Sequence, residues 1–209
     1  MHQKQTIPLA TLLVIMAAFA AAVHDVAAIE YQGLQTEKYL GDVEVVATIE
    51  GEKVFTEGPA FGADGNLYFT NIPVSKILKY DPASGALSVF REDTQETNGL
   101  MFDPQGRLLM CQGGAGQLAR LNLNTGKVEV LAATYNGFPL AAPNDLCYDS
   151  RGRIYFTSRP GTKDPKKGNV NAVYRLDPDG KLTHVRAWPA VHMGNGIVAS
   201  PERQTLYLI

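Results

Sequence analysis

The sequence predicts an all-β fold of the β-propeller type. Four polar residues, Glu57, Asn98, Asn144 and Asn195, each open a short apolar segment and each lie five positions before a turn. These openers are 41, 46 and 51 residues apart, a spacing typical of propeller blades. The repeats lack the 3.6-residue apolar periodicity of helical repeats. We therefore expect a repeating unit made of strands.

Each repeat contains four strand-like segments, which is the composition of a propeller blade. After the opener come a turn and a strand rich in β-branched and aromatic residues, at 64–70, 103–110 and 149–157. A third strand runs into a second turn at 80–85, 121–126 and 176–180, and a fourth strand follows at 86–90, 127–131 and 181–186. We thus expect three full blades, 57–90, 98–131 and 144–186, followed by the first hairpin of a fourth.

The ends of this repeat region indicate a ring that extends beyond it. Residues 43–49 precede the first opener as a fourth strand would, so we expect a strand there that belongs to another blade and closes the ring. Propellers close with about four to eight blades, so about three and a half blades are too few. We expect a C-terminally truncated sequence. The stretch between Arg159 and Asn171 predicts a loop insertion on one face, where loops often border binding sites.

The first 28 residues predict a signal peptide. An apolar stretch from Leu9 to Val23 follows Lys4 and leads to small residues ending at Ala28. A retained anchor is the alternative, although crossing the membrane needs about 20 apolar residues. We expect an exported protein, periplasmic or secreted, with a linker at 29–42 and no membrane contact after cleavage. The net charge of −2 gives no indication of a nucleic-acid partner, and nothing indicates the oligomeric state.

The two cysteines, Cys111 and Cys147, occupy different positions within their repeats. We expect buried free thiols, since free cysteine is among the most buried residue types; a disulfide is the alternative. No CxxC or Cys/His spacing predicts a zinc site.

The openers predict a cation site. The first strand of each blade lies nearest the axis, so a polar side chain at its start would point into the central channel. The Glu57 carboxylate and the amide oxygens of Asn144 and Asn195 are hard ligands that suit Ca²⁺. For Asn98 and Asn195, which precede glycine, the alternative is a turn residue with φ > 0.

Two further side chains are candidates for contacts around this site. Asp145 could orient an amide ligand or cap a loop. Arg159 could contact an oxyanion from the inserted loop, or be a solvated surface arginine. No GxSxG elbow and no usable Ser/His/Asp set is present, which counts against covalent catalysis.

Several motifs in this order resemble the gluconolactonase, regucalcin and luciferin-regenerating enzyme family. They are Glu57-Gly58-Pro59, Pro143-Asn144-Asp145-Leu146, the segment 173–180 and Asn195-Gly196-Ile197. The resemblance covers 43–209, which we interpret as a partial gluconolactonase-like domain. It implies a six-bladed propeller that hydrolyses lactones, or organophosphates in some branches, with a divalent cation on its axis.

The resemblance also assigns roles to residues. Glu57 and Asn195 match the family's metal ligands, Asn144 matches an asparagine that faces the substrate and approaches the metal, and Asn98 lies at the corresponding point of another blade. The predicted cation is Ca²⁺, with Zn²⁺ or Mg²⁺ as alternatives. The predicted substrate-binding residues are Asn98, Asn144, Asp145 and Arg159.

Two departures from the family pattern concern activity. The family's aspartate, a ligand and the expected base, belongs to the next opener, beyond Ile209, so no catalytic residue is identified. After Thr157 the chain reads Ser158-Arg159-Pro160-Gly161 instead of Asp-Pro-Pro-Tyr-Gly, so substrate choice could differ. We expect hydrolysis of a small lactone or sugar-derived substrate, the cation polarising the carbonyl for attack by water. Alternatives are a non-enzymatic exported propeller that binds sugar, metal or protein, and an interaction propeller of the NHL type.

Overall fold

The computed structural model describes residues 41–51, 53–159, 170–200, 202 and 204–209. The chain divides into two units, 1–45 and 46–209, and all described strands belong to the second. The predicted signal peptide, most of the predicted linker and the core of the predicted loop insertion lie outside the described residues. Within the described part, no helix has the length and apolar character needed to span a membrane.

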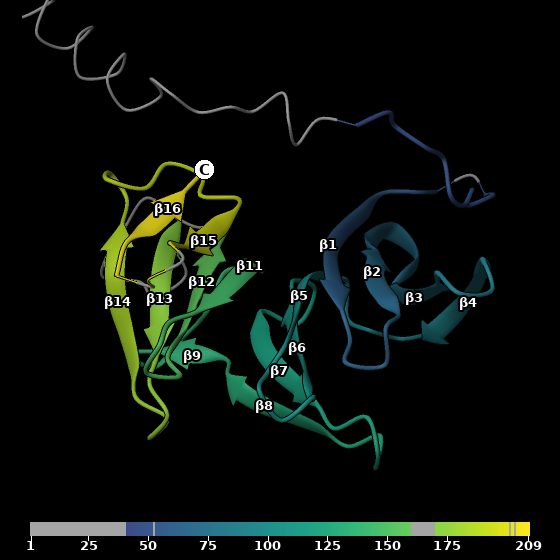
Figure 1. Ribbon diagram of the computed structural model, residues 1–209. Coiled ribbons are helices and arrows are strands. Elements are labelled where there is room, and N and C mark those ends of the chain that lie inside the picture. The colour runs from purple at the N-terminus through teal and green to yellow at the C-terminus, as the bar shows by residue number, and fades with distance from the viewer. Residues whose placement is uncertain (1–40, 52, 160–169, 201, 203) are drawn as a thin grey trace, which may run out of the picture. The chain divides into compact units, whose positions relative to one another are not determined.

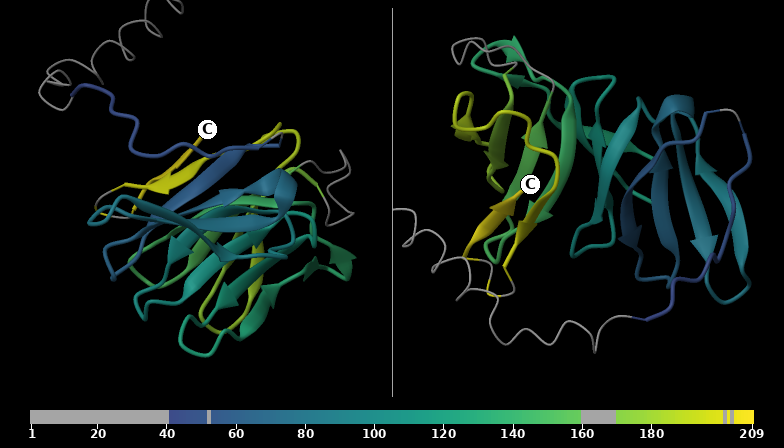
Figure 2. Two further views of the ribbon diagram at one scale, coloured as in Figure 1. Left: turned by 90° about the vertical axis from the view of Figure 1, so that its right-hand side faces the viewer. Right: turned by 90° about the horizontal axis from the view of Figure 1, so that it is seen from above.

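Three antiparallel four-stranded sheets follow one another along the chain (Figures 1 and 2). The first comprises β1 (Thr56–Phe61), β2 (Leu67–Asn71), β3 (Lys76–Asp81) and β4 (Ala86–Arg91). The second comprises β5 (Thr97–Phe102), β6 (Leu108–Gln112), β7 (Gln117–Leu121) and β8 (Val128–Ala132), and the third β11 (Pro143–Tyr148), β12 (Ile154–Ser158), β13 (Ala172–Leu176) and β14 (Leu182–Ala187). The hairpin of β15 (Ile197–Ala199) and β16 (Leu206–Leu208) comes last. The all-β prediction of three blades and a further hairpin is confirmed.

Two short elements were absent from the prediction. A small hairpin, β9 (Thr134–Tyr135) and β10 (Phe138–Pro139), lies between the second and third blades, and η2 (Ile72–Val74) is a short 3-10 helix after β2. The hairpin turns at Asn136 and Gly137, whose φ angles are 50° and 81°. Asn-Gly is a strong signal for such tight turns, so the sequence did carry the information.

The predicted strand at 43–49 is wrong for this structure. Residues 41–50 form no strand, and Val43 and Val45 are 97% and 79% exposed. A strand is stabilised by hydrogen bonds to a neighbouring strand and by packing of one face. None of the described strands pairs with this segment, so its backbone forms no strand.

The blades pack on each other through two apolar cores that share β6. Leu108 and Met110 belong to the core with the first blade, whereas Leu109 and Cys111 belong to the core with the third, and all four are 0% exposed. Successive residues of a strand point to opposite faces, so one strand serves both cores. Cys111 and Cys147 are free and buried, as predicted.

Threonine hydroxyls link the inner strands of neighbouring blades. The Oγ1 atom of Thr70 lies 3.0 Å from the carbonyl oxygen of Glu57 and 3.1 Å from that of Asn98. In the third blade, Thr157 Oγ1 donates to the carbonyl oxygen of Asn195 at 2.8 Å. By strand register, the corresponding residue of the second blade is Cys111. A thiol is a weak hydrogen-bond donor, so the interface between the second and third blades lacks the strong hydroxyl hydrogen bond that Thr70 and Thr157 provide at theirs.

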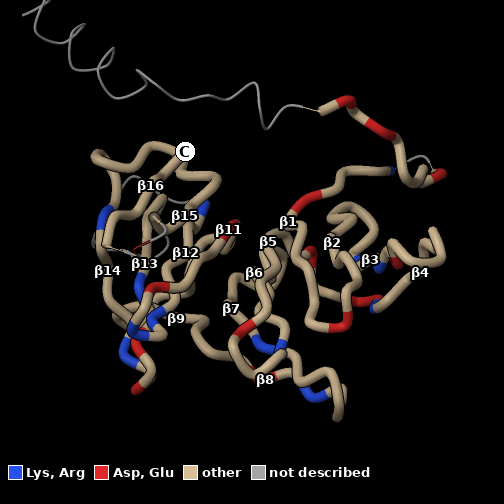
Figure 3. The backbone as a smooth tube through the Cα atoms, viewed as in Figure 1, with Lys and Arg blue, Asp and Glu red and all other residues tan. Residues whose placement is uncertain are grey.

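An aspartate and an arginine close the first turn of the second and third blades, where acidic and basic residues lie together (Figure 3). Asp149 Oδ1 accepts from the backbone N–H groups of Arg151 and Arg153 at 2.9 and 3.0 Å, and its Oδ2 accepts from Arg153 Nε at 2.5 Å. Burial alone would raise the pKa of Asp149, but these hydrogen bonds outweigh it and hold the pKa below its usual value.

The role of the Thr70 hydroxyl can be tested by Thr70→Val. We expect a loss of about 1–3 kcal/mol in the free energy of unfolding, because a partly buried carbonyl would lose its hydrogen-bond donor. Thr94→Val is the matched control, since Thr94 is also buried but its Oγ1 has no hydrogen-bond partner among the described residues. Urea unfolding of both variants measures the difference. Equal stabilities would contradict the link.

The charge of Asp149 should make stability depend on pH. A carboxyl whose pKa is lowered in the folded state contributes stability above its unfolded pKa of about 3.9 and loses it as the pH falls through the folded value. Asp149→Asn should therefore destabilise the protein by about 1–3 kcal/mol near pH 7 and progressively less below about pH 4. Urea midpoints between these pH values test this, with the exposed Asp42→Asn as control. A gap that is constant with pH would exclude a charge effect.

Candidate functional site

The four openers lie at the same end of four successive inner strands. Glu57, Asn98 and Asn144 are the second residues of β1, β5 and β11, respectively, and Asn195 lies two residues before β15. Strand β1 contacts β5, β5 contacts β11, and β11 contacts β15 (Figure 1). The structure thus places the openers in order along one end of the inner strands.

Three of the openers lie in β-bulges. The strand register shifts between Glu57 and Ala60, between Thr97 and Leu100, and between Pro143 and Leu146. A bulge bends its strand and re-aims the side chains within it, and bulges occur often next to functional sites. The polar openers interrupt the apolar pattern of the strands at the points where the bulges occur.

The interpretation of Asn98 and Asn195 as turn residues with φ > 0 is wrong. Neither asparagine nor the glycine after it has a positive φ. Gly99 is required for another reason: a Cβ atom there would lie 2.7 Å from the carbonyl oxygen of Asn144 and 2.9 Å from Asp145 Cα. The backbones of β5 and β11 therefore approach too closely for any side chain at this point.

The opener side chains differ in exposure. Glu57 and Asn98 are half-buried and Asn195 is exposed, whereas Asn144 is only 6% exposed. The Asn144 Oδ1 atom is buried and has no hydrogen-bond partner among the described residues. An unsatisfied buried acceptor costs free energy unless a ligand satisfies it. This oxygen therefore fits a cation or a hydrogen-bond donor from a ligand.

Asp145 and Thr157 connect the third blade to the hairpin that follows. Asp145 Oδ2 accepts from the backbone N–H of Ile197 at 2.9 Å. Thr157 Oγ1 accepts from the backbone N–H of Asp145 at 3.0 Å and donates to the carbonyl of Asn195. Burial raises the pKa of Asp145, and backbone hydrogen bonds, including that from Ile197, oppose the rise without cancelling it.

Arg159 lies at the same end of the third blade as Asn144. Its backbone N–H donates to the carbonyl of Ala142 at 2.8 Å, two residues before that opener. The Nε atom of Arg159 is buried and has no hydrogen-bond partner in the described part of the chain. The residue as a whole is partly exposed, so both a contact to an oxyanion and a surface arginine stay open as predictions.

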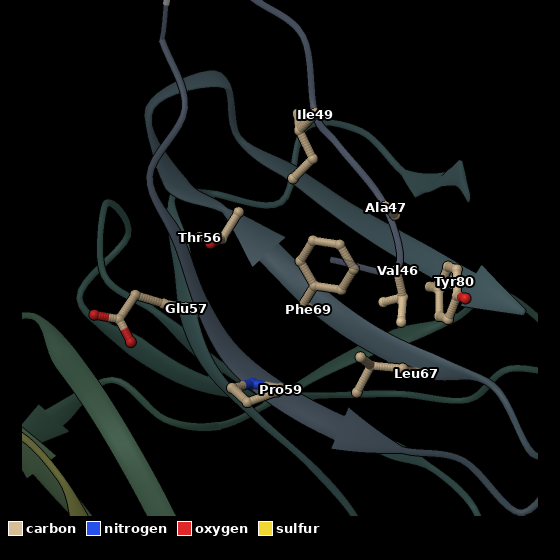
Figure 4. A pocket seen from close by; sticks show the side chains of 9 residues that line it. All are labelled: Val46, Ala47, Ile49, Thr56, Glu57, Pro59, Leu67, Phe69 and Tyr80. Atoms are coloured by element: carbon tan, nitrogen blue, oxygen red, sulfur yellow. The ribbon is translucent and has the colours of Figure 1, made fainter. Parts of the chain in front are cut away.

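One cavity includes Glu57 but none of the other three openers. It has a volume of about 400 Å³ and is lined mainly by apolar side chains of the first blade and of residues 46–49 (Figure 4). Asn98, Asn144 and Asn195 do not line it, and the Glu57 carboxylate points away from Phe69 in this view. Among the described residues no group of three or more His, Cys, Asp or Glu side chains converges, so any cation here would rely on amide oxygens.

The fold is a partial β-propeller whose inner strands carry oxygen-bearing side chains at one end. Residues 55–209 match the family model described as the SMP-30/Gluconolactonase/LRE-like region. This match covers well over half of the chain, and the chain belongs to this family.

Known relatives agree with this assignment. A gluconolactonase from Zymomonas mobilis is 28% identical over an alignment of 186 positions, which covers 79% of this chain and 51% of that protein. The lactonase drp35 of Staphylococcus haemolyticus is 26% identical over 77% of this chain and 49% of its own length. The solved structure of a gluconolactonase from Xanthomonas campestris aligns with a TM-score of 0.66 and 32% identity, over 75% of this chain and 54% of that one. The chain spans about half the length of the relatives it matches.

Sequence reasoning missed the residues that connect the openers. Thr70 and Thr157 each follow a phenylalanine at the end of the second strand, and this repeated Phe-Thr pair was the available signal. Their hydroxyls bond to main-chain groups of openers in the same or the next blade. These contacts depend on how the blades pack, which the spacing of residues along the chain does not show.

The close approach of β5 and β11 can be tested at Gly99. We expect Gly99→Ala to lower the free energy of unfolding by about 1–3 kcal/mol, because the methyl group would overlap backbone atoms that cannot move freely. Gly196→Ala is the matched control: it also follows an opener, but its Cβ would meet only ordinary contacts, the nearest at 3.5 Å. Urea unfolding compares them, and equal losses would contradict the constraint.

Proposed function

We propose that this chain is part of a metal-dependent hydrolase of lactones. The observation that carries the proposal is the buried, unpartnered Oδ1 atom of Asn144 in a row of oxygen-bearing openers. Membership of a family whose matched relatives are gluconolactonases and lactonases supports it. Small lactones or related sugar-derived molecules are the proposed substrates.

We propose Glu57, Asn144 and Asn195 as the ligands of a divalent cation. One carboxylate and two amide oxygens suit Ca²⁺ best, with Zn²⁺ or Mg²⁺ as alternatives. The half-buried Glu57 supplies the negative charge, and the Asn144 oxygen is already free of competing hydrogen bonds within the described chain. When bound, such a cation polarises a carbonyl and stabilises the negative charge that develops on its oxygen.

The neighbouring side chains would hold the substrate. Asn98 and Asn144 present amide groups at the same end of adjacent strands, and Asp145 and Arg159 come from the same end of the third blade. The buried Nε–H of Arg159 is a donor suited to a substrate oxygen. None of the described residues is proposed as the base that activates water.

We also propose that the protein is exported, to the periplasm or beyond the cell. The apolar stretch and small-residue site within residues 1–28 support this. The N-terminal residue of the mature protein tests it.

The cation assignment can be tested with Glu57→Gln. Calcium titration of the purified chain should show binding by the wild type and affinity at least about tenfold weaker in the variant, because ligand charge sets Ca²⁺ affinity. Glu50→Gln, which changes an exposed carboxylate outside the site, should bind as the wild type does. Retained affinity in Glu57→Gln would exclude this ligand assignment.

Activity needs a separate measurement on a form of the protein that includes the next blade. Lactone hydrolysis supported by Ca²⁺ or Zn²⁺, and lost on chelation, is the expected result. Cation binding without any lactone turnover would favour the alternative, a non-enzymatic propeller that binds a ligand at its mouth.

A further inference from the structure

The carboxylate of Asp145 bonds across the boundary between two repeats. It belongs to β11, yet its Oδ2 accepts the backbone N–H of Ile197, which is 52 positions away in β15. Ile197 lies two residues after Asn195, so the bond fixes the backbone next to one proposed ligand. Asp145 itself directly follows Asn144, the other proposed amide ligand. One side chain therefore spans the two openers.

A second group strengthens the same connection. Thr157 Oγ1 accepts the N–H of Asp145 at 3.0 Å and lies 2.8 Å from the carbonyl oxygen of Asn195. The backbone of Asn195 is further held by its N–H, which donates to the carbonyl of Ile209 at 2.6 Å. Asn195 is thus restrained through its main chain while its side chain stays exposed.

The hydrogen bonding separates the roles of Asp145 and Asn144. Its Oδ2 is occupied by the Ile197 N–H, whereas the Oδ1 of the adjacent Asn144 has no partner among the described residues. The half-buried carboxylate of Asp145 accepts a main-chain N–H and so restrains the segment that carries this donor. The oxygen that is free to bind a ligand and the oxygen that restrains the backbone therefore belong to neighbouring residues, Asn144 and Asp145.

We propose that Asp145 is a positioning residue that holds Asn195 in register with Asn144 through its bond to Ile197. It acts on the proposed cation site through Asn195 and is not itself a ligand of the cation. The effect on cation binding rests on the proposed function, whereas the hydrogen bond from Ile197 to Asp145 does not depend on it.

Two substitutions separate positioning from direct contact. Asp145→Asn keeps a carbonyl oxygen that can accept from Ile197 but removes the charge, whereas Asp145→Ala removes both. Positioning predicts Ca²⁺ affinity close to wild type in Asp145→Asn and about 10- to 100-fold weaker in Asp145→Ala, the usual range for residues that orient ligands. A loss in Asp145→Asn as large as that in Asp145→Ala would overturn the proposal.

Amide hydrogen exchange at Ile197 gives a readout that does not depend on a cation. Exchange at this amide should become faster in Asp145→Ala and stay protected in Asp145→Asn. If the wild type binds no Ca²⁺, the proposed function fails, but this measurement still decides the tether. Unchanged exchange in Asp145→Ala would overturn it.

A control separates positioning from a general loss of stability. Asp149→Asn alters a buried carboxylate at the far end of the same strand region and is expected to lower stability, yet it should leave Ca²⁺ affinity unchanged. If Asp145→Ala does not fold, Asp145→Asn together with Thr157→Val still tests the proposal. Thr157→Val removes the second link, so it should weaken Ca²⁺ binding and expose the Ile197 amide; no effect on either would count against the proposal.

Discussion

The close approach of the inner strands is the constraint on which the rest of the structure depends. At the openers, neighbouring backbones come so near that Gly58 and Gly99 leave no room for a Cβ atom. Each of these glycines lies in a bulge with one extra residue. Threonine hydroxyls bond to the facing carbonyls where the first blade meets the second and where the third meets the following hairpin. A side chain can rotate to another position, but a buried main-chain N–H or C=O group needs a hydrogen-bond partner at its fixed place. Main-chain hydrogen bonding therefore determines how neighbouring blades pack.

The candidate site follows from this constraint. A bulge leaves ladder groups unpaired and re-aims side chains, so the polar openers are a product of the same local irregularity that lets blades pack tightly. The Oδ1 atom of Asn144 is buried and has no hydrogen-bond partner among the described residues. The carboxylate of the next residue, Asp145, accepts a hydrogen bond from the following repeat. Binding and assembly are therefore divided between two adjacent residues.

The sequence was sufficient to predict the blades because strands and turns are local. Turn residues such as Gly106 and Gly152, with φ of 72° and 73°, marked each hairpin correctly. The error at 43–49 arose because a strand exists only with a partner, and its apolar residues could not show whether one was present. The sequence also left the role of Gly99 undecided. Beside asparagine it allowed a turn as the alternative, whereas the neighbouring backbone of β11, distant in sequence, explains the glycine.

The alternation of β6 has a consequence for how this assembly comes apart. Leu108 and Met110 pack in the interface with the first blade, and Leu109 and Cys111 pack in the interface with the third. All four side chains are fully buried. The second blade cannot lose its structure without exposing both interfaces at once. Blades built from similar repeats are therefore not independent modules here: one five-residue strand couples their stabilities, as interfaces do in other repeat proteins.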